Sequence, residues 1–502
     1  MTEPFDLTAL VLDTLAKSDV APIDLAVVGH TNTGKTSLLR TLLRDPNFGE
    51  VADRPGTTRH VESAQLLIGD GTPVLTLRDT PGLEDSMAVL DYLERLVKPD
   101  ERPDGPERIR RFLDSPEGAH RFEQEARVLS TVLTCHAALY VIDVRDPILA
   151  KHKDELSLLT ACGRPILPIL NFTRSPYSQA HAWRESLARL GLHITVDFDT
   201  VAPALDGETQ LIDRLSTLLE GQADTLQRLK QDLAEQHQHR RQDAARLVAE
   251  LLLDAAALRL PCESDKHAQY AVTQTLRERT RKREQQCVQA LLKLYHFNRS
   301  TFPDHVLPLE GERWGMDLFH PLALKAFGIQ LGKGMATGAV AGATIDAMTG
   351  GLSLGAATLI GAAAGGLWQG TNQWGKRLMG RLAGHLEITI DDPVLDLLAL
   401  RQLALIRALE QRGHAALTPI DPGTLLKPTE PISAPVETTD KAPADPGVST
   451  IGKNTLPDGL RALLHEARSQ PQWSSLGVDP LPDTRREQHV KRIASILTKA
   501  LS

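Results

Sequence analysis

The residues best suited to chemistry form one short run near the amino end of the sequence, Gly29-His30-Thr31-Asn32-Thr33-Gly34-Lys35-Thr36. A helix-like segment that begins at Ser37 follows this run. In such a loop, glycines let backbone amides turn toward phosphate oxygens, a lysine reaches the β and γ phosphates, and a hydroxyl group binds Mg²⁺. Gly29, Gly34, Lys35 and Thr36 supply these parts. The run therefore predicts a phosphate-binding loop, and we expect residues 29–37 to line a nucleotide site.

A second run, Asp79-Thr80-Pro81-Gly82, follows a predicted strand at residues 74–77. It puts a carboxylate where it can bind Mg²⁺ through water, and a glycine amide where it can meet the γ-phosphate. Between the two runs lies an exposed loop at residues 54–60, which contains Thr57 and Thr58. A threonine there can complete the Mg²⁺ shell only when the γ-phosphate is present, and this is the behaviour of a switch.

These motifs resemble those of the Era/TrmE-type, 50S ribosome-binding-like GTPases, whose first switch carries Gly-Thr-Thr-Arg and whose second switch begins Asp-Thr-Pro-Gly. The resemblance covers residues 24–205. It implies binding of GTP and GDP, hydrolysis of GTP to GDP and phosphate, and Mg²⁺ as the cofactor. The residues that it assigns to catalysis and to Mg²⁺ are Asn32, Lys35, Thr36, Thr58 (with Thr57 as the alternative), Asp79 and Gly82.

Leu83 occupies the position at which Ras-like enzymes keep a catalytic glutamine. An apolar side chain cannot orient the attacking water, so another group or an ion must assist. In the resembling family this assistance includes a potassium ion held by an asparagine of the phosphate-binding loop, and Asn32 stands at that position. A local hydrogen bond within the loop is the alternative role for Asn32, and the sequence leaves both open.

The resemblance weakens at the base-recognition motif, where the family pattern is Asn-Lys-x-Asp and this chain has Asn171-Phe172-Thr173-Arg174. Asn171 matches, and we expect it at the nucleotide site. The absent aspartate is the group that would accept hydrogen bonds from guanine N1 and N2, so the sequence leaves selectivity for guanine over adenine open. GTP remains the expected nucleotide. A weak candidate for the fifth motif follows at Thr200-Val201-Ala202.

The elements that must position these residues alternate between short apolar runs and amphipathic helical ones over residues 1–222. This rhythm predicts a doubly wound α/β domain with a mostly parallel sheet. The predicted strands lie at residues 25–28, 64–68, 74–77, 137–142, 166–170 and 193–196.

From residue 223 to about 300 the sequence has long, charge-laced helical patterns, interrupted at Pro261. We expect residues 223–417 to form a mainly α-helical domain that ends with a helix at 393–413. Residues 418–450 are rich in Pro, Thr and Asp and predict a flexible linker. Residues 451–502 predict a short helical tail with helices at 459–468 and 486–501.

A Gly/Ala-rich segment, residues 328–375, stands apart within the helical domain. Its glycines recur every four residues, which puts them on one helix face and predicts a glycine-zipper hairpin with arms at 334–345 and 352–368 and Asp346 at the turn. Trp368 and Trp374 precede basic residues, as at a membrane interface. Three interpretations stay open: a packed soluble hairpin, a shallow or reversible membrane hairpin, and a self-association zipper.

The whole architecture resembles a bacterial family in which an Era-like GTPase domain is fused to a carboxyl-terminal domain of unknown function. The resemblance rests on the Gly-rich run at residues 338–357 and on the run at residues 390–417. It implies no activity for the second domain.

Composition and charge narrow the class of protein. The 502 residues carry 56 Lys and Arg against 64 Asp and Glu, a net charge of −8, which argues against a protein that mainly coats nucleic acid. The four cysteines form no CxxC pair, and the first residues lack an export signal, so we expect a cytoplasmic protein, peripheral at the inner membrane if the hairpin binds lipid.

Two functions follow from the sequence. The first is a slow GTPase that acts as a nucleotide-dependent switch, coupled through its helical half to a membrane or a membrane-protein partner. The alternative is a ribosome- or RNA-associated assembly GTPase. A basic cluster at Arg277, Arg279, Arg281, Lys282 and Arg283 is a solvated helix face, or it contacts RNA or anionic lipid.

Overall fold

The computed structural model describes residues 21–45, 48, 62–69, 71–98, 100–201, 203–204, 206–297, 309–310, 313–314, 317–320, 323–324, 343–346, 386–411, 456–477 and 483–501. The chain divides into two compact units, residues 1–238 with 410–417 and residues 239–409 with 418–502. The boundary falls inside one long helix, α10 (Ala223–Ala257), whereas the sequence analysis placed it just before that helix.

The first unit contains a six-stranded sheet in the order β2-β3-β1-β4-β5-β6. β2 is antiparallel to β3, and the other neighbouring strands are parallel, which confirms the predicted mostly parallel α/β fold. The last strand was predicted at residues 193–196, whereas the structure has a two-residue strand at Val196–Asp197. The strands are β1 (Ile23–Val28), β2 (Glu62–Leu67), β3 (Pro73–Asp79), β4 (Ala137–Asp143), β5 (Ile166–Asn171) and β6 (Val196–Asp197).

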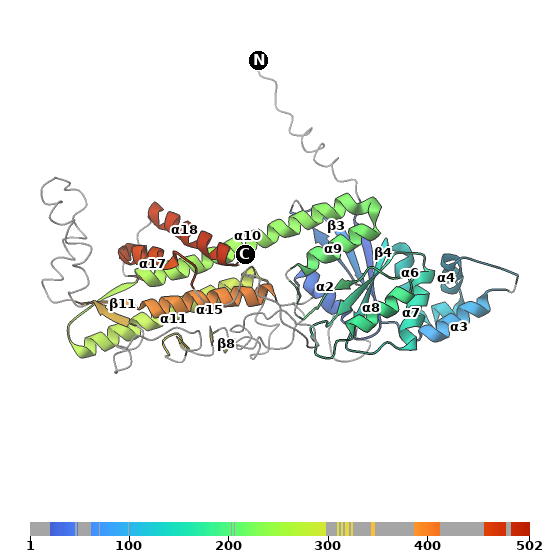
Figure 1. Ribbon diagram of the computed structural model, residues 1–502, viewed down its shortest axis with the longest axis horizontal. Coiled ribbons are helices and arrows are strands. Elements are labelled where there is room, and N and C mark those ends of the chain that lie inside the picture. Colours follow the sequence, from blue (N-terminus) through green and yellow to red (C-terminus); the bar gives the residue numbers. More distant parts are fainter. Residues whose placement is uncertain are drawn as a thin grey trace, which may run out of the picture. The chain divides into compact units, whose positions relative to one another are not determined.

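Helices cover both faces of this sheet (Figure 1). β1, β4 and β5 are buried on both sides, and their continuous apolar sequences fit such central parallel strands. One face packs against α2 (Lys35–Leu43), α9 (Gly207–Leu218) and the first part of α10. The other face packs mainly against α3 (Ser86–Leu96), α4 (Gly105–Leu113), α6 (Glu123–Thr134), α7 (Ala150–Ala161) and α8 (Ala180–Arg189). The short helix α5 (Pro116–Ala119) precedes α6.

The strand register brings the predicted functional residues to one edge of the sheet. Val27 of β1 pairs with Asp79 of β3, and Asp143 of β4 pairs with Asn171 of β5. Because parallel strands end at the same edge, the loops that follow β1, β3 and β5 meet there, as ligand sites of open α/β sheets do.

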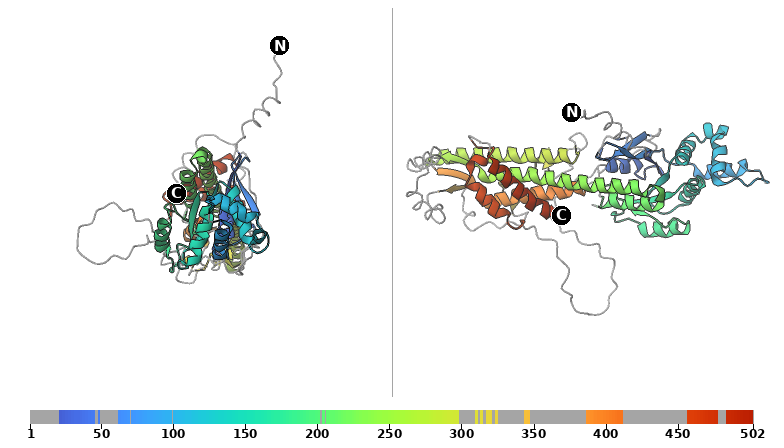
Figure 2. Two further views of the ribbon diagram at one scale, coloured as in Figure 1. Left: turned by 90° about the vertical axis from the view of Figure 1, so that its right-hand side faces the viewer. Right: turned by 90° about the horizontal axis from the view of Figure 1, so that it is seen from above.

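The second unit has a helical core with a small antiparallel sheet. Its helices are the later part of α10, α11 (Lys266–Leu294), α15 (Asp392–Glu410), α17 (Leu460–Arg468) and α18 (Thr484–Leu501). α10 and α11 run alongside one another (Figure 2), joined through β7 (Arg259–Cys262), where Pro261 interrupts the helical pattern as expected. The sheet order is β10-β11-β7, with β10 (Ala343–Asp346) and β11 (Leu386–Ile390), and a separate pair joins β8 (Leu309–Glu310) to β9 (Arg313–Trp314).

Two features of this unit differ from the sequence analysis. Residues 343–346 lie in a strand that pairs with β11, so the prediction of a helical arm ending in a turn at Asp346 is wrong for these residues. The rest of the Gly/Ala-rich segment and the predicted linker lie outside the described residues. The two tail helices were predicted correctly, and their apolar residues join the core of the second unit.

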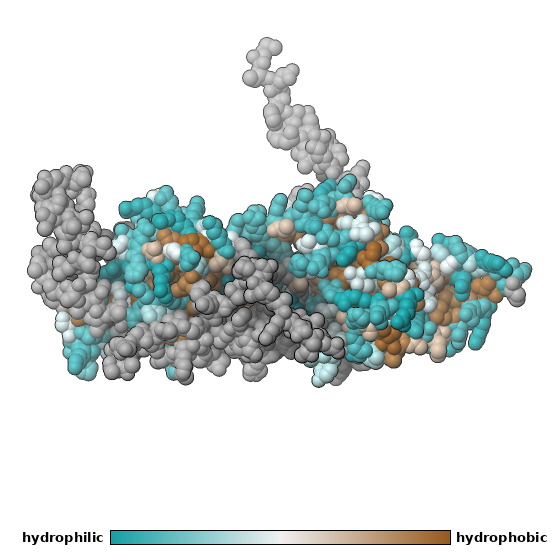
Figure 3. Space-filling model, in the orientation of Figure 1, coloured by the Kyte–Doolittle hydropathy of each residue, from teal (hydrophilic) through white to brown (hydrophobic). Residues whose placement is uncertain are grey.

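The surface bears on the membrane hypothesis. On the face shown in Figure 3, most of the described residues at the surface are hydrophilic, and the hydrophobic ones form separate patches. No helix among the described parts of the chain has both the length and the apolar character for crossing a bilayer.

All four cysteines are buried free thiols.

Candidate functional site

The loop between β1 and α2 wraps around the side chain of Lys35. The Lys35 Nζ atom donates hydrogen bonds to the backbone oxygens of Gly29 (3.2 Å) and His30 (2.9 Å), and burial lowers the pKa of Lys35 to about 8. Gly34 has φ 94°, and a Cβ there would overlap the side chain of Asn171. The loop therefore needs glycine at this position, and it holds its lysine ready beside the amino end of α2.

Thr36 and Asp79 form the polar centre of the site. The Thr36 hydroxyl donates a hydrogen bond of 2.6 Å to Asp79 Oδ2, and Asp79 is only 1% exposed. Burial raises the pKa of Asp79 to about 6, although the Thr36 hydrogen bond and the charge of Lys35 oppose the shift. Asp79 Oδ1 has no hydrogen-bond partner among the described residues. A hydroxyl and a carboxylate side by side, with one oxygen unsatisfied, are the hard donors that Mg²⁺ prefers.

The segment after Asp79 lies directly against the phosphate-binding loop. A Cβ at Gly82 would overlap Thr31, and the backbone amide of Leu83 donates to the Gly29 oxygen at 3.3 Å. The Leu83 side chain is fully buried in the core on one face of the sheet. An apolar side chain buried in the core cannot orient a water molecule.

Asn171 joins three segments of the site. Its Nδ2 atom donates to the Thr33 oxygen at 2.9 Å, and its Oδ1 atom accepts from the amides of Phe172 (2.9 Å) and Thr200 (3.0 Å). Fully buried, it ties the phosphate-binding loop to the ends of β5 and β6. Thr200, from the weak fifth-motif candidate, thus lies at the site, while Ala202 is outside the described residues.

Other predicted residues have more varied positions. Asn32 is exposed with φ 64°, and its side chain makes no hydrogen bond with the described residues, so the local loop bond is not observed. Ser37 lies in the first turn of α2. Thr57 and Thr58, the predicted first-switch residues, lie outside the described part of the chain.

Sequence reasoning missed a buried network beneath the phosphate-binding loop. His30 Nδ1 lies 2.8 Å from Glu155 Oε1, and the Tyr140 hydroxyl donates to Glu155 Oε2 at 2.7 Å. Lys151 Nζ lies 2.9 Å from His30 Nε2. An ammonium group can only donate, so Nε2 accepts and Nδ1 carries the proton donated to Glu155. The network fixes the loop through a residue of α7 that no local motif marks.

α6 holds the segment that follows Gly82, and this was also missed. The Gln124 side-chain amide donates to the Gly82 oxygen. The buried Glu125 carboxylate accepts from the amides of Glu84 (3.3 Å) and Asp85 (3.0 Å). Two adjacent side chains of one helix therefore set the backbone position of the expected second switch.

The fold and this site define the class of protein: the first unit is a P-loop GTPase domain, and the family model described as "50S ribosome-binding GTPase" matches residues 24–172. A second model, described as "Domain of unknown function (DUF3482)", matches residues 184–495. That match covers more than half of the chain, and the chain belongs to this family. In this chain, the residues that match the GTPase model precede those that match the family's own domain.

The comparison with curated proteins found no match. Among solved structures, similar chains include a variant of Era from Aquifex aeolicus bound to GDP and AlF4⁻ (TM-score 0.28, 16% identity, 39% of this chain and 56% of that chain). Another is Era with MgGDPNP and nucleotides 1506–1542 of 16S ribosomal RNA (0.28, 17%, 39% and 55%). A third is the bacterial selenocysteine-specific elongation factor (0.26, 15%, 40% and 29%). The alignments span little more than half of the Era chains.

The basic cluster of the second unit is largely engaged within that unit. Arg279 donates to the Leu476 oxygen (2.7 Å), Arg281 pairs with Asp317 (2.5 Å) and Arg283 pairs with Asp254 (2.9 Å). The arginines of this basic cluster therefore serve mainly to pack the helices of the second unit.

The described residues hold no group of three or more His, Cys, Asp or Glu suited to a metal ion.

Proposed function

We propose that this protein binds GTP with Mg²⁺, hydrolyses it slowly, and acts as a nucleotide-dependent switch whose state reaches the helical unit through α10. The observation that carries the proposal is the buried Thr36–Asp79 pair beside Lys35. A hydroxyl, a carboxylate and an ammonium group at one loop fit a nucleotide phosphate with its metal ion, and few other ligands need all three.

Each residue has a distinct part in the proposal. Lys35 exchanges its bonds to the loop oxygens for bonds to the β and γ phosphates, and the backbone amides of residues 29–37 bind the remaining phosphate oxygens. Thr36 and Asp79 would hold Mg²⁺, with Thr58 added in the GTP state. The ion, when bound, neutralises phosphate charge. The Gly82 amide meets the γ-phosphate, and Asn171 keeps the base end of the site attached to the loop.

Slow hydrolysis follows from Leu83. Its buried side chain cannot orient water, so hydrolysis depends on another positive group. We propose that Asn32 helps to hold a potassium ion against the phosphates. The exposure of Asn32 and its lack of a hydrogen bond with the described residues support this role, because its carbonyl oxygen is free to bind an ion.

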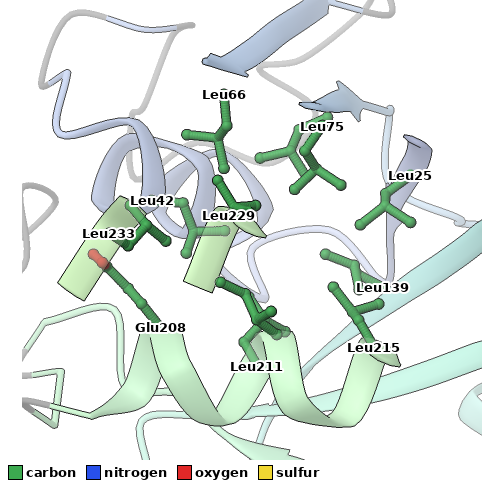
Figure 4. Close-up of a pocket in the computed structure, with 12 residues that line it drawn as sticks. Leu25, Leu42, Leu66, Leu75, Leu139, Glu208, Leu211, Leu215, Leu229 and Leu233 are labelled. Carbon is green, nitrogen blue, oxygen red and sulfur yellow. The ribbon is translucent and has the colours of Figure 1, made fainter. Parts of the chain in front are cut away.

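The path of the signal is supported by the contacts of the first part of α10, which lie wholly within the first unit. Leu229 and Leu233 point toward Leu25, Leu42 and Leu66 around a small apolar cavity between the sheet and the helices (Figure 4). This packing makes the start of α10 part of the GTPase core, although the sequence pattern assigned it to the next domain.

α10 makes polar contacts with residues that come before and after the expected first switch in the sequence. Asp232 accepts a hydrogen bond from the Gly69 amide, in the turn between β2 and β3, at 2.9 Å. His237 Nε2 lies 2.6 Å from Arg44 Nη2, and Arg44 pairs with Glu208 of α9 at 3.0 Å. Arg44 precedes the switch loop and Gly69 follows it. A movement of that loop on GTP binding would therefore change the contacts that α10 makes with the residues before and after the loop.

The partner that receives the signal is proposed to be a membrane or a membrane protein. The support is the Gly/Ala-rich segment, which has no charged residue from Ala347 to Gly375 and carries Trp368 and Trp374 near its end. The ribosomal alternative draws on the name of the matched GTPase family, but the arginines that would serve it are engaged in contacts within the second unit. We therefore favour the membrane-linked switch.

The direct test is equilibrium binding of GTP, GDP and ADP, with Mg²⁺, to the full chain and to Lys35→Ala. Binding that requires Lys35 supports the proposal. Co-sedimentation with ribosomal subunits in one nucleotide state, with none on liposomes, would favour the alternative.

A further inference from the structure

The peptide group between Gly82 and Leu83 is held from two sides. Its carbonyl oxygen accepts a hydrogen bond from the side-chain amide of Gln124 in α6. Its N–H group, the backbone amide of Leu83, donates to the Gly29 oxygen of the phosphate-binding loop at 3.3 Å. Because the peptide group is planar, a rotation of this plane would break both hydrogen bonds. A side chain of α6 and a backbone oxygen of the loop therefore fix the plane together.

The two residues that follow are held by one buried carboxylate. Glu125 Oε1 accepts hydrogen bonds from the amides of Glu84 (3.3 Å) and Asp85 (3.0 Å), and Glu125 is only 5% exposed. Hydrogen bonds to a charged acceptor are roughly twice as strong as neutral ones, and burial strengthens them further. The backbone from Gly82 to Asp85 is thus tied to Gln124 and Glu125, two adjacent residues in the first turn of α6.

α6 itself is anchored by apolar packing. Val128, Leu129 and Val132 of this helix are fully buried in the core on one face of the sheet. The helix therefore owes its position to the core of the GTPase domain and not to contacts with the phosphate-binding loop. We expect Gln124 and Glu125 to keep their positions whichever nucleotide is bound.

Gly82 lies between these two side chains and the phosphate-binding loop. A Cβ at Gly82 would lie 2.8 Å from both the backbone nitrogen and the Cα of Thr31, so the two segments are in close contact. Two residues earlier, the Thr80 hydroxyl donates to the Val27 oxygen of β1 at 2.8 Å, and the ring of Pro81 fixes φ in between. The chain is thus restrained on both sides of the Gly82 N–H group, which the proposed function assigns to the γ-phosphate.

We propose that Gln124 and Glu125 are positioning residues that favour GTP over GDP, because they hold Gly82 where its N–H group meets the γ-phosphate. This inference rests on the proposed function. GDP has no γ-phosphate, so releasing the segment costs it no contact. GTP would either lose the Gly82 hydrogen bond or have to order the segment as it binds, and both reduce its affinity.

The test compares equilibrium binding of GDP and of a non-hydrolysable GTP analogue, each with Mg²⁺, to the full chain and to variants of α6. Gln124→Met has a similar length but cannot donate to the Gly82 oxygen. We expect its affinity for the GTP analogue to fall by about tenfold, the effect of one hydrogen bond, and its affinity for GDP to stay within about twofold. Glu125→Ala should act in the same way.

Two matched variants serve as controls. Glu125→Gln keeps an oxygen that accepts from the two amides, so its affinity for the GTP analogue should fall by about threefold or less. Glu123→Gln changes the preceding residue of α6, which is exposed and pairs with Arg127 at 2.5 Å. This change should alter neither affinity.

Hydrogen exchange of the wild-type protein tests the inference without a variant. The amides of Glu84 and Asp85 should be protected with GDP, and equally protected with the GTP analogue, because the same hydrogen bonds serve the GTP state. Protection that falls when the GTP analogue binds would overturn the inference, since Glu125 would then oppose that state.

The binding outcomes separate this inference from the proposed function. An unchanged ratio of the two affinities in folded Gln124→Met and Glu125→Ala would overturn the inference, because these residues would then only stabilise the fold. A ratio that shifts toward the GTP analogue would also overturn it. In either case, binding that Lys35→Ala abolishes would leave the proposed function standing. Wild type that binds neither nucleotide would contradict both.

Discussion

The Asp232 carboxylate of α10 accepts a hydrogen bond of 2.9 Å from the backbone amide of Gly69, in the turn between β2 and β3. These residues are 163 positions apart in the sequence. The hairpin of β2 and β3 follows the expected first switch, so any shift of that hairpin changes this hydrogen bond. In the proposed function, α10 thus has a contact that depends on the switch region.

The first prediction tests this contact. Hydrogen exchange of residues 223–257 should differ between the GDP state and the state with a non-hydrolysable GTP analogue. In Asp232→Ala this difference should be roughly half as large, because α10 loses one of its two contacts with the residues that flank the expected switch. The free energy of unfolding should fall by about 1 kcal/mol or less, since the bond is exposed. Glu235→Ala removes an equal charge from the next turn and should leave the exchange response intact. An intact response in Asp232→Ala would rule out this path.

Potassium dependence is the second prediction. At equal concentrations of KCl and NaCl, GTP hydrolysis should be at least about fivefold faster in KCl, because an ion of the right size adds positive charge at the phosphates. Asn32→Ala should remove the difference while GDP binding persists. Equal rates in both salts would eliminate the potassium role and favour an activating residue supplied by a partner.

The third prediction concerns the core of the second unit, where Glu284 Oε1 lies 3.6 Å from Arg401 Nη1. Burial raises the pKa of Glu284 to about 7, and the charge of Arg401 only partly opposes this shift. The folded state therefore binds the proton more tightly than the unfolded state, in which the pKa is near 4.5. The contribution of Glu284 to the free energy of unfolding is greatest below pH 4.5 and is lost as the pH rises through about 7.

Glu284→Gln removes this titration, so the variant should lose less stability than wild type between pH 5 and pH 7.5, by up to about 3 kcal/mol. Denaturant unfolding at both values measures the difference. Glu278→Gln, an exposed change on the same helix, should follow the wild-type profile. A Glu284→Gln profile parallel to wild type would show that Glu284 does not titrate in this range.

The meeting of the two motifs at one edge of the sheet could be predicted from sequence because each motif is contiguous. The loop at residues 29–36 and the run at Asp79 carry their own strand and helix context, and parallel strand ends bring them together. The residues that hold them could not be found in this way. His30 and Glu155 are 125 positions apart, and Glu125 reaches Asp85 across 40 positions, with no spacing rule to link them.

Two other differences between the predicted and the observed fold also arise from contacts between residues far apart in the sequence. Residues 343–346 sit among glycines spaced for a helix, but pairing with β11 places them in a strand, and that partner lies some forty residues later in the chain. The start of α10 has the charged pattern of a separate helical domain, whereas Leu226, Leu229 and Leu233 pack with the core of the first unit.

Membrane association is the fourth prediction. Flotation with liposomes of anionic lipid should recover more protein with a non-hydrolysable GTP analogue than with GDP. The Gly/Ala-rich segment has only a marginal affinity for membranes, so burying it within the protein in the GDP state is enough to prevent binding. Replacing both Trp368 and Trp374 by Ala should abolish recovery, and Gly338→Leu should change its dependence on nucleotide. Failure to float in either nucleotide state would favour a soluble role for the Gly/Ala-rich segment.

The most direct test of the account is nucleotide binding to Lys35→Ala. Lys35 is buried within the loop, and its ammonium group is the positive charge that the proposed function assigns to the phosphates. Isothermal titration with GDP and Mg²⁺ should show binding to wild type and to Lys153→Ala, an exposed lysine change in the same unit. Lys35→Ala, shown to be folded by circular dichroism, should bind at least about 100-fold more weakly, the loss expected when charge-assisted hydrogen bonds to phosphate are removed. A folded Lys35→Ala protein that binds GDP as tightly as wild type would contradict the assignment of this site.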